Sequence, residues 1–194
     1  MRKFDLILVI ILVATTNIHA QDSNQQPELP ELHAIRMVTL SPSYSCRSSA
    51  REGYAKTALF LTAYFKRQNS PDLLFNGACG SDDYFQAATA GDDMSLVADL
   101  GLVSLEEVSA ARAFNLKRVH SPADNSKFAQ TAKVELNHSY AVLLNGRDKR
   151  GLLLFTVVGY VPNQKVELRY TVKSYQIITN YSVSQGFDWE KRSK

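Results

Sequence analysis

The sequence predicts a mainly β protein, an antiparallel β-sandwich or barrel-like domain with one or two short helices; an α+β fold is the alternative. Residues 165–175 alternate between apolar and polar side chains, residues 151–161 are apolar on both faces, and turn residues recur at short intervals. The composition, with 45% hydrophobic and 21% charged positions among 194 residues, is that of an ordinary globular protein.

The first twenty residues have the organisation of a secretory signal peptide. Arg2 and Lys3 precede an apolar run over 6–14, and the small residue Ala20 follows a short polar stretch. The apolar run is about half as long as the ~20 residues that a membrane-spanning helix needs. We therefore expect cleavage after Ala20, a secreted or periplasmic location, and no transmembrane segment in the mature chain.

The mature chain is expected to contain a tether, one domain and a tail. Residues 21–33 are polar, include two prolines and show no apolar periodicity, which predicts a flexible tether. A single β-rich domain is expected over 34–182, and residues 183–194 form a charged C-terminal tail.

Export determines how the two cysteines, Cys46 and Cys79, are interpreted. In an oxidising compartment, two cysteines of a compact domain usually form a disulfide. No histidine stands at metal-ligand spacing from them, and no base for a cysteine nucleophile can be identified. We therefore predict a disulfide between Cys46 and Cys79.

The N-terminal half of the domain gives mixed signals. Residues 54–65 place apolar side chains at helical spacing but are rich in residues that favour strands, so both alternatives stay open. Residues 105–114 have the strongest helix signal, with Ser104 as N-cap and two glutamates in the first turn. Three short segments bounded by turn residues are expected to form strands: 72–76, 84–89 and 95–100.

The C-terminal half predicts an antiparallel meander of three strands, over 139–144, 151–161 and 165–175. Asn145–Gly146 and residues 162–164 supply the two turns. The central strand is expected to be covered on both faces, including at Val158. In the last strand we expect Val166, Leu168, Tyr170 and Val172 to face the core, and Glu167, Arg169 and Lys173 to face solvent.

Two pairs of aspartates beside glycines are the only candidates for a metal site. Asp82, Asp83, Asp92 and Asp93 carry the oxygen ligands that Ca²⁺ prefers. Their spacing matches no known calcium loop, and aspartate beside glycine is typical of solvated turns. We therefore expect no metal ion and no cofactor.

Three basic residues at the expected hairpin tip, Arg147, Lys149 and Arg150, are candidates for contact with an anionic surface. Charged hairpin tips are also common simply because they are solvated. The net charge of +3 is nearly balanced, so we expect no nucleic-acid partner. Asn137 and Asn180 begin formal glycosylation sequons, which matter only in a eukaryotic host.

No motif in the sequence demands catalysis, since a nucleophile elbow and a phosphate-binding loop are both absent. We expect a non-catalytic exported domain that binds an unknown protein or glycan partner or has a structural role in the cell envelope or outside the cell. The alternative is a small exported hydrolase in which Asp83 or Asp93 meets His120 or His138 only in the folded chain.

Overall fold

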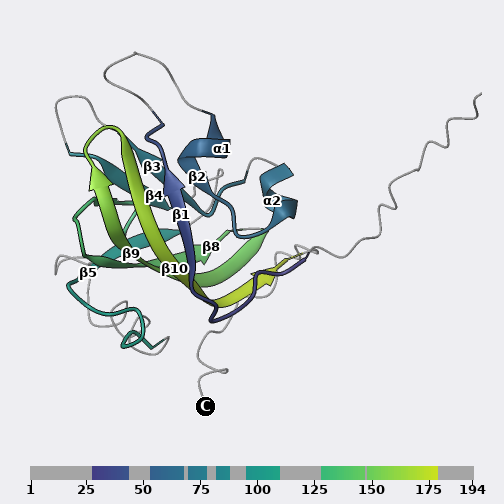
Figure 1. Cartoon of the computed structure of the whole chain (residues 1–194). Helices are drawn as coiled ribbons and strands as arrows, with labels where there is room; N and C mark the ends of the chain where they lie inside the picture. Colours follow the sequence, from purple (N-terminus) through teal and green to yellow (C-terminus); the bar gives the residue numbers. More distant parts are fainter. Residues whose placement is uncertain are drawn as a thin grey trace, which may run out of the picture.

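The computed structural model of the chain describes residues 28–43, 53–67, 70–77, 82–87, 95–109, 128–146 and 148–178. These residues form two antiparallel sheets that pack against each other as a sandwich (Figure 1). The predicted mainly β class is therefore confirmed. No helix in this described part of the chain is long and apolar enough to cross a membrane.

The larger sheet has six strands in the order β1-β10-β9-β8-β5-β6. Its members are β1 (Arg36–Leu40), β5 (Leu96–Gly101), β6 (Phe128–Ala129), β8 (Ser139–Asn145), β9 (Lys149–Val161) and β10 (Lys165–Ile177). Strands β8, β9 and β10 pair in sequence, so the predicted meander is confirmed. Asn163, in the turn between β9 and β10, has a φ of 56°, a conformation that asparagine tolerates well.

The smaller sheet has the order β2-β3-β4-β7. Its strands are β2 (Ala58–Leu59), β3 (Leu73–Asn76), β4 (Tyr84–Ala87) and β7 (Thr131–Lys133). Two short helices, α1 (Tyr54–Thr57) and α2 (Ala63–Arg67), flank β2 on either side in the sequence. The ambiguous segment 54–65 is therefore neither one helix nor one strand. The Thr62 hydroxyl accepts a hydrogen bond from Phe65 N–H at 3.2 Å and so caps α2.

Aromatic side chains from both sheets form the centre of the main core. Phe85 of β4 lies 5.2 Å from Tyr140 of β8 and 4.8 Å from Phe155 of β9, between ring centroids and in edge-to-face contacts. Tyr140 and Phe155 stack on each other at 4.9 Å. Such contacts stabilise aromatic pairs beyond the burial of their area. They hold the smaller sheet against the middle of the larger one.

The predicted alternation of β10 is correct for its core face. Val166, Leu168 and Val172 are buried, and Tyr170 is half-buried against the same core. The residues expected to face solvent, Glu167, Arg169 and Lys173, are half-buried instead. One cause is visible at Arg169, whose guanidinium pairs with Glu106 from the segment that follows β5.

Two bulges interrupt the strict alternation of β9 and β10. Val158 has no partner in the register between these strands and is 41% exposed, which corrects the expectation that it is covered. Lys173 is the extra residue of β10, and beyond it Tyr175 and Ile177 turn toward the main core. An extra residue shifts the side-chain period by one, which a simple alternation does not anticipate.

The predicted helix over 105–114 is not formed in its described part. Ser104 Oγ accepts a hydrogen bond from Glu106 N–H at 3.3 Å, as an N-cap would, but only a turn follows at 105–107. Leu105 and Val108 are buried against the outer face of the larger sheet, in a second core cluster. Leu105 and Val108 are thus spaced by a single turn that covers this face. Residues 110–114 lie outside the described residues.

Replacing Leu168 by Ala should lower the free energy of unfolding by ~2–5 kcal/mol, because it removes a fully buried side chain and leaves a cavity. Gln176→Ala on the exposed side of the same strand is the control, and it should change stability by no more than about 0.5 kcal/mol. Denaturant unfolding of both variants beside the wild type measures the difference. Equal losses would contradict the face assignment of β10.

Candidate functional site

Lys149 lies inside the sandwich and not at a solvated hairpin tip, which corrects the expectation for this basic candidate. Its side chain is 1% exposed, and its ammonium donates hydrogen bonds to Ser70 O at 2.8 Å and Pro71 O at 2.9 Å. The reason is a short turn after β8. Gly146 N–H donates to Lys149 O at 2.9 Å, so that β9 already begins at Lys149 and directs its side chain inward.

Asp72, directly before β3, is the charged partner of Lys149. Its side chain is 0% exposed, and its Oδ1 lies 3.2 Å from Lys149 Nζ. The Tyr175 hydroxyl donates to Oδ1 at 3.2 Å, and Leu61 N–H donates to Oδ2 at 2.7 Å. Burial raises the pKa of Asp72, and the positive charge of Lys149 opposes this rise.

The Lys149–Asp72 pair connects the two sheets, because Lys149 belongs to the larger sheet and Asp72 leads into the smaller one. The ring of Phe65, on α2, covers the ammonium with its centroid 4.6 Å from Nζ. Both charged side chains are enclosed by protein, so a dissolved substrate has no access to them. The pair belongs to the interior of the fold and not to an open binding site.

The other predicted site residues lie partly inside and partly outside the described residues. Arg150 is half-buried on β9, opposite Gln176 of β10. The basic surface proposed for the hairpin tip is therefore reduced by the inward position of Lys149. Six of the predicted site residues lie outside the described residues: Cys46, Cys79, Asp92, Asp93, His120 and Arg147.

Asp82 and Asp83, which directly precede β4, bond to other groups of the protein. Asp83 is buried, and its Oδ2 accepts hydrogen bonds from the Tyr160 hydroxyl at 3.0 Å and from Asn163 N–H at 2.6 Å. Burial and the neighbouring carboxylate of Asp83 raise the pKa of Tyr160. Asp82 is exposed and lies 3.2 Å from Lys133 Nζ. Within the described ranges, no three acidic, histidine or cysteine side chains are grouped so as to hold a metal ion.

His138 pairs with an aspartate that the sequence analysis did not single out. Its Nδ1 lies 2.9 Å and 3.0 Å from the two carboxylate oxygens of Asp99, and Gly101 N–H donates to Asp99 Oδ1 at 2.8 Å. A carboxylate in this position orients an imidazole. The neighbouring hydroxyl of Ser139 is committed to Val103 O and Thr156 Oγ1. Asp99 was missed because it lies within a predicted strand, far from His138 in the sequence.

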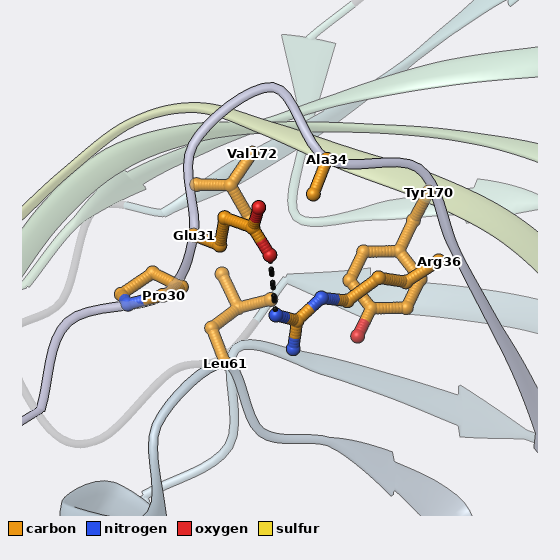
Figure 2. A pocket seen from close by; sticks show the side chains of 7 residues that line it. All are labelled: Pro30, Glu31, Ala34, Arg36, Leu61, Tyr170 and Val172. Atoms are coloured by element: carbon orange, nitrogen blue, oxygen red, sulfur yellow. Dashed lines mark hydrogen bonds and ion pairs between the residues drawn. The ribbon is translucent and has the colours of Figure 1, made fainter.

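A small notch lies where the chain before β1 passes over the margin of the sandwich (Figure 2). Arg36 Nη2 and Glu31 Oε2 form an ion pair at 3.2 Å across it, and His33 N–H donates to Val172 O at 2.8 Å. The notch leaves room for about one water molecule and so does not fit an organic substrate. Its lining residues are Pro30, Glu31, Ala34, Arg36, Leu61, Tyr170 and Val172.

Four exposed apolar side chains lie on the segment that leads into β1 and on β1 itself. We call these residues, Leu29, Leu32, Ile35 and Met37, the N-terminal strip. Met37 is 61% exposed, the largest value among them. Within the described residues, β1 pairs with β10 on one side and with no strand on the other. Sequence patterns did not predict β1, because its apolar residues point both inward and outward.

Comparison with known proteins found no matching family model, no similar curated protein and no similar solved structure. The geometry of this chain is therefore the basis for its proposed function.

Replacing Lys149 by Met should lower the free energy of unfolding by ~3–5 kcal/mol at pH 7, because Asp72 is left buried without its charged partner. Burial then raises the pKa of Asp72 without the opposing charge of Lys149, so the folded variant holds a proton that the unfolded chain releases above about pH 4. The stability of this variant should consequently fall as the pH rises from 5 to 7.

The control is the double variant Lys149→Met, Asp72→Asn, which cannot titrate at residue 72 and should lack this pH dependence. Urea unfolding of the wild type and both variants at pH 5 and pH 7 measures this pH dependence of stability. An equal loss of stability at pH 5 and pH 7 in the single variant would contradict the described environment of Asp72.

Proposed function

We propose that this chain is an exported, non-catalytic β-sandwich domain that binds a protein partner along the N-terminal strip. The coincidence of exposed apolar side chains with a strand edge is the observation that supports the proposal. An edge strand offers backbone N–H and C=O groups to an extended segment of another protein, and nearby apolar side chains add buried area.

The interior polar groups support a binding role more than catalysis. Asp72 and Asp83 each accept hydrogen bonds from two or more partners within the fold, and both are buried. The notch beside the strip holds about one water molecule, far less than a substrate pocket offers. A surface interaction needs neither a pocket nor an unpaired ionisable group.

The proposal includes export and a Cys46–Cys79 disulfide. Ser43, three residues before Cys46, donates its N–H to Phe75 O at 3.0 Å and its hydroxyl to Asn76, three residues before Cys79. Three residues of extended chain span at most ~11 Å. The contact between the two segments that lead to the cysteines supports a bridge between them.

The second candidate is a small exported hydrolase, and the contact of His138 with Asp99 favours it. In that case His138 acts as a base oriented by Asp99, and not by the predicted Asp83. Hydrolytic activity that is lost in His138→Asn, while variants of the N-terminal strip keep it, would decide for this candidate.

The disulfide predicts that the exported protein, denatured without a reductant, has no reactive thiol and gains two on reduction. Cys46→Ser is the control, because it should leave Cys79 as one reactive thiol before reduction. Thiol labelling followed by mass spectrometry gives the count. Two reactive thiols in the unreduced wild type would refute the bridge.

If the N-terminal strip is the binding site, a photoreactive side chain at position 37 should form an adduct with one partner protein in the cells that export the chain. The matched control is position 102, where Leu102 is equally apolar and 77% exposed but lies outside the strip. Ile35→Asp should weaken the adduct about tenfold, because it places a charge in the apolar contact. Equal adducts at both positions, or an adduct at 102 alone, would contradict the proposed surface.

A further inference from the structure

The Lys149–Asp72 pair brings an amine and a carboxyl group together in the interior of the fold. Nζ and Oδ1 are 3.2 Å apart, and neither side chain is more than 1% exposed. We propose that Lys149 Nζ and the Asp72 side chain condense to an amide, so that one covalent bond joins the two sheets. This inference goes beyond the proposed function and is independent of export and partner binding.

The reaction needs no oxidant, cofactor or second molecule. A proton passes from the Lys149 ammonium to the Asp72 carboxylate, which leaves a neutral amine and a neutral acid. The amine lone pair then attacks Cγ, an N–C bond forms, a C–O bond breaks, and one water molecule leaves with the second amine proton. The product is a secondary amide, which carries no charge in the core.

The enclosure of the pair favours both stages of this reaction. A low-dielectric interior favours neutral groups over a charged pair, and burial accordingly raises the pKa of Asp72. Leu61 N–H at 2.7 Å and the Tyr175 hydroxyl at 3.2 Å donate to the two carboxyl oxygens. These donors withdraw electrons from Cγ and stabilise the negative charge that develops on oxygen during attack.

The amine is also held in place for the attack. Ser70 O and Pro71 O accept its hydrogen bonds, and the Phe65 ring lies against it. Such fixation replaces a bimolecular collision by a step within one molecule, which raises the effective concentration of the amine by orders of magnitude. After condensation the nitrogen keeps one hydrogen, which can still bond to one of the two carbonyls.

A second carboxyl group lies in the same region. Asp148 Oδ2 is 3.4 Å from the hydroxyl of Ser70, the residue whose carbonyl accepts from Lys149. Its Oδ1 is buried and has no hydrogen-bond partner within the described part of the chain. A buried carboxylate oxygen without a hydrogen bond is costly. As a base, Asp148 would accept the second amine proton during the attack and pass it on to the departing hydroxyl group, which leaves as water.

The test is a peptide map of the folded, full-length protein after denaturation, reduction and trypsin digestion. The proposal expects one branched peptide that contains Asp72 and Lys149, lighter by one water than its two linear parts, and no cleavage after Lys149. Two separate linear peptides at full yield would overturn it.

Intact mass gives a second readout with Lys149→Arg as the matched control. Arginine keeps the positive charge but is not expected to condense, so the measured difference from wild type should exceed the sequence difference by one water. Equality with the sequence difference would overturn the proposal. Asp148→Asn tests the proton acceptor separately: a mixture of linked and unlinked chains supports this role, and complete linkage removes it.

Discussion

The burial of a lysine ammonium against an aspartate is the constraint on which the rest of this structure depends. Removing both charges from water is costly unless each finds its partners inside the fold. Lys149 and Asp72 meet this condition only when β9, the segment before β3, the turn at Leu61 and helix α2 are all in place. The pair therefore links the position of the smaller sheet to that of the larger one.

Because the charged groups of the interior are enclosed by the fold, we expect the functional site at the surface. The buried carboxylates are engaged with groups of the fold itself, whereas the N-terminal strip exposes apolar side chains beside the outer strand β1. The contact between His138 and Asp99 is the second accessible feature, and it is only half-buried. A sandwich that exposes apolar side chains along an edge strand suits a domain that presents one surface to a partner.

Sequence patterns predicted the elements that depend on local periodicity and missed those that depend on distant contacts. The meander and the core face of β10 follow from alternation, which a sheet imposes directly. The bulges at Val158 and Lys173 shift that period without a local signal. Lys149 was placed at a solvated tip because a basic residue beside a turn is ordinarily exposed, and its partner Asp72 lies 77 positions away in the sequence. Asp99 was missed for the same reason.

Native-state hydrogen exchange at the Leu61 amide tests the central role of the pair most directly. Leu61 belongs to no helix or strand, so its amide would ordinarily exchange fast, but here it donates to the buried Asp72 carboxylate at 2.7 Å. If the pair holds the sheets together, this amide should exchange only through global unfolding, as slowly as the central amides of β9. Exchange at the rate of an exposed turn would show that this region opens independently and would contradict the account.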